Sequence, residues 1–535
     1  MLAQSLPFFV ITPTLIAVFL YIFFSLKTAR FIAISIQGLF LIPAVMLLLA
    51  AREETIRVSV GDYDGFLGII LRVDAVAAVF VLLTVFIFFI IGIYTLQTPY
   101  DRTKRLYLFL IFLLQGSLIG LFITQDFFNV FVLIEVGTVV VTILLMYDRA
   151  RRNLFAGMTF IMVNIVVMQF YLFGLGYLYI ITGVMDLAAA TEIIAGMDNT
   201  NQFVLPYALI MTAIASKCSL LPMLTFLPKV NSLTGSRFTI AAIMSGLHIK
   251  GGVYLFIRFQ DVFGGIGTDF FLIIGILTAF VGVIMALAQT EVRLLLAYST
   301  VAQVGLIVAG LSLENDYSTI GSFFHIVNHS LFKVALFLCA SQITYVYYTK
   351  DITKIRGAFK KLPLISIANI IAILGIVGAP LVNGSVSKYF LMYGADGLLE
   401  WVIILINLGT ILVFVKYSFI FFGKPLGETR TDEDAKPDIY RLSVVYGIGV
   451  LCIVFGVFGV QTIQFLFNES VVLGLRGYLE KALIFVVSVA VGVVVCKFTK
   501  FEFLKPLNGL CLSFQKIIVS IGVFFAVIVA FVGFM

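Results

Sequence analysis

Residues 318–348 read STIGSFFHIVNHSLFKVALFLCASQITYVYY, an apolar stretch that contains three ionisable side chains, His325, His329 and Lys333. Its length and composition predict one membrane-spanning helix. Steps of four and eight residues turn through about 40° and 80° on an α-helix, so the three side chains share one face over about 12 Å. Ionisable groups at membrane depth are costly unless they face a bundle interior or a water-filled cavity. The stretch therefore indicates a path for protons or ions, with a purely structural polar cluster as the alternative.

The whole chain has the composition of a polytopic helical membrane protein. Of its 535 residues, 61% are hydrophobic and only 12% are charged. Apolar runs of about 18 residues or more recur throughout, which excludes a soluble fold, and their lack of strict alternation excludes a transmembrane β-barrel. The formal net charge of +7 falls mostly in short loops, so it does not indicate binding to nucleic acid.

Sixteen apolar segments are candidate membrane-spanning helices, and 481–496 is the shortest of them. That segment fits either a span or a helix at the membrane surface. The sixteen segments are 7–26, 30–50, 71–96, 105–124, 127–147, 153–182, 204–226, 238–259, 269–290, 293–313, 318–348, 363–393, 400–421, 441–467, 481–496 and 512–534.

Basic residues are distributed unevenly between the two sets of loops that alternate along the chain. One set contains the clusters at 148–152 and 349–361 and most of the other loop lysines and arginines. The opposite set contains few, among them Arg52 and Arg476. Because cytoplasmic loops are enriched in Lys and Arg, the first set is predicted to face the cytoplasm and both termini the outside.

Three polar stretches are predicted to lie outside the membrane. Residues 51–70 alternate apolar and polar side chains and predict a short external hairpin. Residues 183–203 are predicted to form an external loop, and 423–440 a solvated cytoplasmic linker. Asp74 and Asp126 fall at the starts of spans, so we expect them at helix ends rather than in an ion path.

Four further lysines, Lys217, Lys250, Lys388 and Lys416, and one glutamate, Glu135, lie inside predicted spans. Lys416 is near the cytoplasmic end of its span, where its side chain can extend to the interface. Glu135 lies in FVLIEVGTVV, deep in the fifth span. A buried carboxylate near a buried ammonium can exchange a proton with it, because each charge favours the ionised form of the other.

Two spans are predicted to be broken, and each contains a lysine. Residues 204–226 contain Lys217 and then Pro222, and residues 363–393 contain GIVGAPLVNGSVSK, which ends at Lys388. Breaks at membrane depth are tolerated where the backbone lines a cavity. Matching broken segments in two halves of a transporter indicate its ion path. The pattern therefore predicts two related half-channels joined by polar residues along the membrane midplane.

The motifs around these residues resemble a known family over roughly residues 70–420. They are Glu135 in its fifth span, SKCSLLPMLTFLP with Lys217, HIKGGVYLFIRF with Lys250, EVRLLLAYSTVAQVG at 291–305, HIVNHSLFKVALF at 325–337 and GAPLVNGSVSKYF with Lys388. The chain is similar to the antiporter-like subunits of Mrp-type cation/proton antiporters, respiratory complex I and membrane-bound hydrogenases, most of all to the Mrp D-type subunits. The chain departs from that family at two places. The family often has a histidine and a tryptophan before LP, where this chain reads LTFLP at 224–228. The second broken helix of the family usually has two prolines and an aromatic residue after the glycine, where this chain reads APLVNG at 379–384.

This resemblance implies an organisation for the chain. It implies about fourteen core helices with discontinuous helices and two inverted five-helix repeats, at 105–259 and 269–421. The N-terminal helices and the external hairpin would occupy 1–104, and 422–535 would hold the C-terminal helices, one or two of them additional.

The resemblance also implies roles for the intramembrane residues. Glu135 and Lys217 would form a coupled pair, and Lys250 with the helix of His325, His329 and Lys333 would relay protons to Lys388. Some relatives have glutamate at the position of Lys388, and the carboxyl group of glutamate also titrates.

The implied function is that of a proton-translocating component of a multisubunit Mrp-type antiporter that exchanges Na⁺ or another monovalent cation for H⁺. The alternative is an ion-pumping membrane component of a redox-driven complex, such as a complex I-like NADH dehydrogenase, a membrane-bound hydrogenase or a sulfur reductase. In both cases the expected partners are other membrane subunits and the lipid of a prokaryotic cytoplasmic membrane.

We expect no cofactor, metal or catalytic chemistry in this chain. His325 and His329 have the spacing of a metal-binding pair, but the glutamate of HExxH is missing. There is no Walker lysine motif and no GxGxxG at a strand–helix junction. Either function therefore requires partner subunits, and an antiporter that works without partners is a third alternative.

Overall fold

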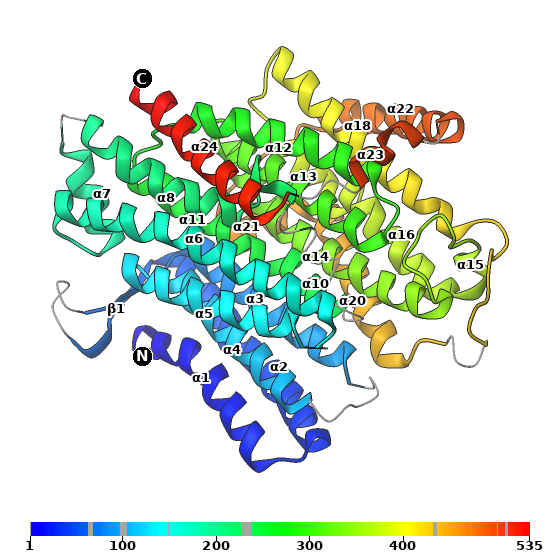
Figure 1. Ribbon diagram of the computed structural model, residues 1–535, viewed down its shortest axis with the longest axis horizontal. Helices are drawn as coiled ribbons and strands as arrows, with labels where there is room; N and C mark the ends of the chain where they lie inside the picture. The colour runs from blue at the N-terminus through cyan, green and yellow to red at the C-terminus, as the bar shows by residue number, and fades with distance from the viewer. Residues whose placement is uncertain are drawn as a thin grey trace.

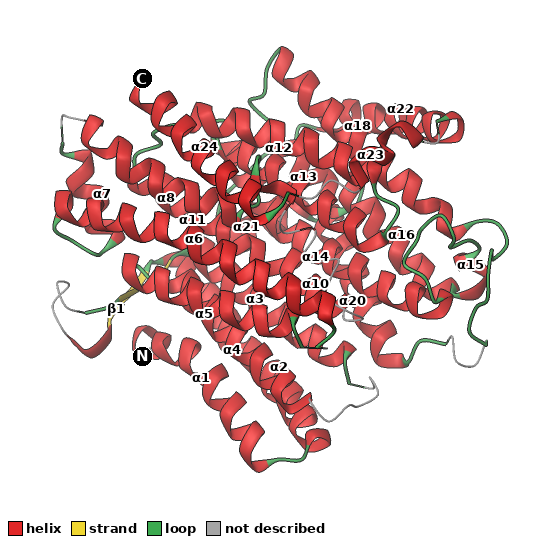
Figure 2. Cartoon of the chain, in the orientation of Figure 1, coloured by secondary structure: helices red, strands yellow, loops and turns green. Residues whose placement is uncertain are grey.

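The computed structural model describes residues 2–62, 68–96, 104–147, 149–197, 200–225, 228, 238–431, 436–499, 501–508 and 512–534. Figure 1 shows these residues as one bundle of helices, and Figure 2 shows that strands form only a small part of it. Among the described residues, 14 helices are long and apolar enough to cross a membrane. The predicted all-α polytopic fold is confirmed, while the inverted relation between two repeats stays a prediction.

The N-terminal region consists of three long helices and a two-stranded hairpin. Strand β1 (Ile56–Ser59) pairs antiparallel with β2 (Ile70–Val73), so a hairpin is present as predicted but ends three residues beyond the predicted 51–70. The tip of that hairpin, 63–67, lies outside the described residues. The other elements here are α1 (Leu2–Phe23), α2 (Leu26–Glu53), the 3-10 turn η1 (Val60–Asp62) and α3 (Ala75–Tyr94).

Helix α3 begins later than the predicted segment 71–96 because β2 occupies its first residues. Asp74 is the N-cap of α3 and accepts a hydrogen bond of 2.9 Å from the N–H of Ala77. It also forms an ion pair of 2.7 Å with Arg258, 184 residues further along the chain. Burial opposes ionisation of Asp74, but the charge of Arg258 and these hydrogen bonds hold its pKa below the usual range. Asp74 therefore has the structural role expected of an acid at a helix end.

The first predicted repeat differs from expectation in one loop. Residues 183–203 contain a short helix, α7 (Leu187–Ala195), because an alanine-rich run follows the N-cap Asp186. The break predicted in 204–226 is present: α8 ends at Lys217. The helices and turns of this region are α4 (Lys104–Ile123), α5 (Phe127–Leu145), α6 (Arg151–Thr182), η2 (Thr200–Phe203), α8 (Val204–Lys217), η3 (Met223–Thr225), α10 (Phe238–Ile243), η4 (Met244–His248) and α11 (Ile249–Val262).

The second predicted repeat is arranged around α14 (Asp316–Tyr347), the helix formed by the opening stretch. Asn315 caps its N-terminus, and the helix packs against α10, α13, α16, α17 and α20. The predicted break in 363–393 separates α16 from α17. The elements of this region are α12 (Thr268–Ala288), α13 (Val292–Leu311), α15 (Ala358–Lys361), α16 (Pro363–Val377), α17 (Asn383–Leu391), α18 (Leu398–Ser418) and η5 (Phe419–Phe421).

The C-terminal helices are α20 (Ile439–Val457), α21 (Gly459–Phe467), α22 (Leu475–Phe498), α23 (Lys505–Asn508) and α24 (Phe514–Gly533), with the 3-10 turn η6 (Glu502–Leu504) before α23. Segment 441–467 is divided at Phe458. Segment 481–496 belongs to a helix of 24 residues, which is long enough to cross a membrane. Helix α22 packs against α18, whereas α24 packs against α6 and α8, so the C-terminal helices contact both of the predicted repeats.

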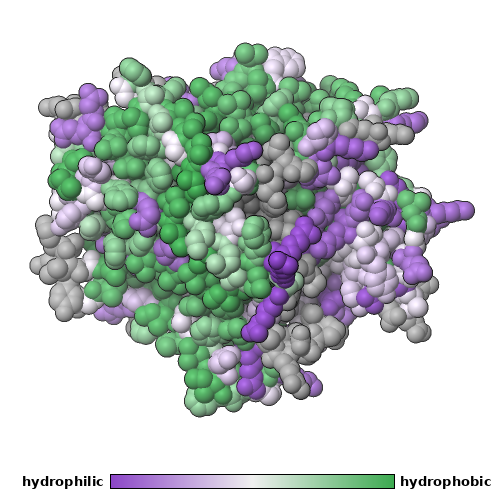
Figure 3. All heavy atoms as spheres, viewed as in Figure 1, coloured by the Kyte–Doolittle hydropathy of each residue, from purple (hydrophilic) through white to green (hydrophobic). Residues whose placement is uncertain are grey.

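The two ends of the bundle carry different elements. Figure 1 shows β1, α7 and both termini at the left end, and α15 at the right end. This arrangement agrees with the predicted sides of the hairpin, the 183–203 stretch and the 349–361 loop. Figure 3 shows a largely hydrophobic surface in the left and central parts of the same view, with hydrophilic residues gathered toward the right.

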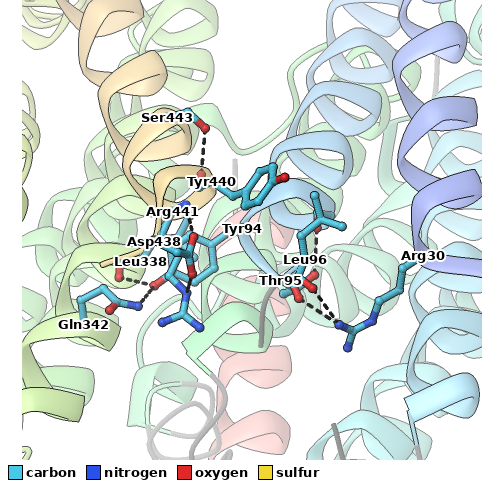
Figure 4. A network of polar contacts seen from close by, with 11 residues as sticks. Arg30, Tyr94, Thr95, Leu96, Leu338, Gln342, Asp438, Tyr440, Arg441 and Ser443 are labelled. Carbon is cyan, nitrogen blue, oxygen red and sulfur yellow. Dashed lines mark hydrogen bonds and ion pairs between the residues drawn. The ribbon is translucent and has the colours of Figure 1, made fainter. Parts of the chain in front are cut away.

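A polar network ties the end of α3 to distant helices (Figure 4). The hydroxyl of Tyr94 donates to the carbonyl of Leu338 at 2.9 Å and accepts from Gln342 at 3.0 Å, both on α14. The guanidinium of Arg441, at the start of α20, lies 5.7 Å from the centre of the Tyr94 ring. The network fixes the position of α14, the helix that carries the histidines.

Candidate functional site

The first broken segment presents Lys217 to polar side chains on two neighbouring helices. Its Nζ donates to Oδ1 of Asn164 on α6 at 2.6 Å and to Oγ1 of Thr138 on α5 at 3.1 Å. Because α8 stops at Lys217 and the chain turns through Ser219 at φ 55°, the lysine lies at a helix end inside the bundle. A desolvated ammonium needs such acceptors.

Glu135 lies one turn before Thr138 on α5 and is only partly buried. Its buried Oε1 has no hydrogen-bond partner among the described residues. The described residues include no ion pair between Glu135 and Lys217, although the two are close enough for their charges to interact. Their coupling therefore stays a prediction. Exposed apolar side chains, Val132 and Val136, flank Glu135 on the outer surface of the bundle.

The second lysine of the series joins the two predicted repeats directly. Nζ of Lys250 on α11 lies 2.6 Å from Nδ1 of His329 on α14, and it donates to the carbonyl of Ser245 at 2.5 Å. Lys250 and His329 are both fully buried. Nε2 of His329 has no hydrogen-bond partner among the described residues. This contact is the one that the prediction of joined half-channels requires.

The three ionisable residues of α14 contact the helices α11, α13 and α17, and both His325 and Lys333 contact α13. His325 places Nδ1 2.9 Å from Oγ of Ser387 on α17, and Nε2 3.1 Å from Oε1 of Gln303 on α13. Lys333 donates instead to Ser299 and to the carbonyl of Leu296, both on α13. His325 therefore contacts the second broken segment through Ser387, whereas the hydrogen bonds of Lys333 go to residues of α13.

The second broken segment holds Lys388 in the same manner as the first holds Lys217. Nζ of Lys388 donates to the carbonyl of Ile376 at 2.7 Å and to Oδ1 of Asn407 on α18 at 2.7 Å. The carbonyl of Ile376 belongs to the last turn of α16, whose final carbonyls have no partner within the helix. At Gly384 a Cβ atom would lie 1.8 Å from the carbonyl oxygen of Gly375, so α17 can approach α16 only because this residue is glycine.

A pocket with about 560 Å³ of empty space, its open mouth included, lies beside Lys388. Its polar lining includes Ser385, Asn407, Tyr478, Lys481 and Ser488. Tyr478 on α22 shares a hydrogen bond of 3.0 Å with Ser385 and accepts one from the N–H of Leu381. Lys481 forms an ion pair with Glu400 on α18. The additional C-terminal helix α22 is thus one wall of the second site.

Lys416 is explained by helix packing. Its Nζ donates to the carbonyls of Leu287 at 2.6 Å and Gln289 at 2.8 Å, at the C-terminal end of α12. A cation there complements the helix dipole. Lys416 therefore serves as a structural lysine against which the others can be compared.

The sequence predicted the charged residues of the series but missed the neutral residues that hold them. Asn164, Asn407 and Gln303 are amides inside apolar helices, and this intramembrane polarity is the signal that could have identified them. The contact between Lys250 and His329 joins residues 79 positions apart and has no local signal.

The bundle and its buried polar series define a polytopic membrane protein of the ion-translocating class. Residues 124–413 match the family model described as NADH:quinone oxidoreductase/Mrp antiporter, TM. This match covers more than half of the chain, and the chain belongs to that family. All seven predicted site residues lie within the matched range.

Individual relatives come from two kinds of complex. The chain is 26% identical over 419 residues to the D-type subunit of the Na(+)/H(+) antiporter of Alkalihalophilus pseudofirmus, covering 76% of this chain and 84% of the relative. It is 28% identical over 438 residues to the N-type subunit of the NADH-quinone oxidoreductase of Desulforudis audaxviator, covering 79% of this chain and 86% of the relative.

Solved structures confirm the fold. A chain in the structure of the Mrp complex from Dietzia sp. DQ12-45-1b has a TM-score of 0.80 at 21% identity, covering 90% of this chain and 100% of that chain. A chain of the membrane-bound sulfane sulfur reductase, an archaeal respiratory membrane complex, has a TM-score of 0.79 at 21% identity, covering 92% of this chain and 100% of that chain.

Proposed function

We propose that this chain is the proton-translocating component of a multisubunit Mrp-type antiporter that exchanges Na⁺ or another monovalent cation for H⁺. One observation carries the proposal: the contact of 2.6 Å between Lys250 and His329 joins the polar residues of the two halves. Protons enter the series near Glu135 and Lys217, pass through Lys250 to His329 and His325, and leave from Lys388. Each of these groups can hold and release a proton.

The transfer between His325 and Lys388 runs through a short polar link. Ser387 bonds to His325 at 2.9 Å and immediately precedes Lys388 in α17. The neutral amine of Lys388 receives the proton, and the pocket beside it gives the proton access to the outside. A broken helix suits this step, because its unpaired carbonyls stabilise the ammonium without a permanent counter-ion.

The proposal includes partner subunits and a cytoplasmic membrane. Glu135 is only partly buried within this chain, on a surface with exposed apolar side chains. A carboxylate on a lipid-facing surface is costly, which favours cover by another membrane protein of the same complex. The charge distribution of the loops favours a cytoplasmic location for 148–152 and 349–361.

A second function has support from a specific observation. The similarity to an NADH-quinone oxidoreductase component is as strong as that to an antiporter component, at 28% and 26% identity. The same polar series would then pump ions inside a redox-driven complex. The difference between the two functions lies in the partner subunits and not in this chain.

The test is purification of the intact complex from its native membrane. Under the first proposal, reconstituted vesicles exchange an imposed Na⁺ or K⁺ gradient for protons, and the complex contains no redox subunits. Exchange that requires NADH, hydrogen or a sulfur compound, with a peripheral redox arm among the subunits, would contradict the antiporter proposal and favour the second function.

A further inference from the structure

The segment between Lys217 and Lys250 contains an irregularity in its helix. Residues Met244–His248 form a π-helical turn, η4, between α10 and α11. The N–H of Ile249 donates to the carbonyl of Met244, five residues earlier, and the carbonyl of Ser245 accepts the ammonium of Lys250. In a regular α-helix that N–H would bond to Ser245. Turns of this kind occur frequently at functional sites.

The π-turn also positions His248, a histidine that is not part of the proton route proposed above. His248 lines a small cavity together with Lys217, Ser117, Gly137 and Leu255. Its Nδ1 is buried with no hydrogen-bond partner among the described residues. An imidazole nitrogen without a partner is costly inside a membrane protein, so its retention requires a reason.

Close backbone packing brings the ring to Lys217. A Cβ atom at Gly252, one turn after His248, would lie 2.9 Å from the backbone nitrogen of Cys218 and the carbonyl carbon of Lys217. The backbone of α11 therefore touches the end of α8 where the first break begins. Lys217 is near enough for its charge to act on the His248 ring.

His248 and Lys250 lie at the same helix end but face two different neighbours. Residues two positions apart point in nearly opposite directions on a helix, about 200° around the axis. His248 faces the Lys217 cavity, and Lys250 contacts His329 on α14. The Lys250 side chain turns back to Ser245, so its ammonium lies level with the π-turn that carries His248.

We propose that His248 carries protons across this helix, from Lys217 to Lys250. The imidazole takes a proton from the Lys217 ammonium, which becomes a neutral amine, and forms an imidazolium. The imidazolium then gives one proton to the neutral amine of Lys250 and returns to its neutral form. The cavity is lined by both Lys217 and His248 and is large enough to hold water, which completes the first of these transfers. This inference rests on the proposed proton route and adds the residue that joins its first two lysines.

Two nearly isosteric substitutions separate proton transfer from packing. His248→Gln keeps hydrogen-bonding capacity but cannot hold a proton, whereas His248→Glu can. Proton-coupled cation exchange is measured in vesicles and expressed per assembled complex. We expect the Gln variant to lose at least about tenfold in rate and the Glu variant to retain clearly more than the Gln variant. Met244→Leu, which preserves volume in the same turn, should leave the rate unchanged.

The outcomes separate this inference from the function on which it rests. A Gln variant that exchanges like the wild type, or Gln and Glu variants reduced equally, would overturn the role of His248 and leave the route intact. A wild-type complex that moves no protons would overturn both proposals. If the Gln variant does not assemble, His248→Asn and His248→Asp give the same comparison with smaller side chains.

Discussion

The two broken segments hold their lysines alike but are enclosed differently. Lys217 and Lys388 each donate to one amide oxygen, from Asn164 and Asn407 respectively. The cavity beside Lys217 has mainly apolar walls, with His248 as its main other polar group. The pocket beside Lys388 is lined by several polar side chains, and α22 of the same chain forms one wall.

This difference indicates that the two halves have different roles in proton transfer. The first site lies near the partly exposed Glu135, where a partner protein can act, whereas α22 of this chain lines the second site. The second site opens into a pocket that is lined in part by α22 and has polar groups that can solvate a departing proton. We therefore interpret the first half as the coupled entrance and the second half as the exit.

Of the two broken segments, the exit is expected to show the larger effect. Lys388→Arg should lower proton-coupled exchange about a hundredfold or more, because the guanidinium remains protonated and cannot complete the transfer. Lys388→Glu should retain part of the rate, since a carboxyl group titrates. Lys416→Met is the matched lysine control and should transport normally. Exchange rates in vesicles measure all three, and wild-type transport by the arginine variant would place the exit elsewhere.

The entrance should be sensitive to loss of its carboxylate. Glu135→Ala should reduce exchange at least about tenfold, because the proton and charge that Glu135 contributes to Lys217 are lost. The complex should still assemble, as shown by its yield on purification. A variant that assembles in low yield but exchanges normally per complex would instead identify Glu135 as a structural group at an interface with a partner.

Effects of moderate size are expected from the two amides, Asn164 and Asn407, that accept hydrogen bonds from Lys217 and Lys388. Removing a hydrogen bond to a charged group costs about 1.5–3 kcal/mol when nothing replaces it. Asn164→Leu should reduce exchange about tenfold, because only Thr138 then remains for Lys217. Asn407→Leu should reduce it about threefold, since Lys388 keeps the Ile376 carbonyl and a polar pocket. Equal losses in vesicle assays would remove the distinction between the two sites.

The smallest effect is expected from the wall of the exit pocket. Tyr478→Phe removes the hydroxyl that bonds Ser385 and the N–H of Leu381, so the second break becomes less well fixed. The exchange rate should change about twofold, in line with one hydrogen bond near a solvated pocket. A loss as large as that of Lys388→Arg would show that α22 takes part in the transfer itself.

The sequence was sufficient where the signal is local. Long apolar runs, the histidines of 318–348 and the lysines beside Gly and Pro breaks predicted the spans, α14 and both discontinuous segments. The helix α7 was missed because the acidic residues of 183–203 were given more weight than its alanine run. The later start of α3 depends on pairing with β1, which a hydropathy pattern does not contain.

The candidate site was less predictable, because its geometry depends on contacts between distant segments. Helical periodicity places His325, His329 and Lys333 on one face but does not say which neighbour each one meets. The hydrogen-bond partners of Lys217 proved to be Thr138 and Asn164. The π-turn at Met244–His248 likewise contacts the distant helix α14, a neighbour that the local sequence does not indicate.

The proposed proton route depends most on the single contact between Lys250 and His329. The direct measurement is proton uptake by vesicles that contain the purified complex with Lys250→Met, compared with the wild type at equal amounts of assembled protein. We expect uptake no greater than that of protein-free vesicles, because His329 then loses the titratable group that it contacts in the first half. Uptake at half the wild-type rate or more would contradict a route through Lys250 and His329.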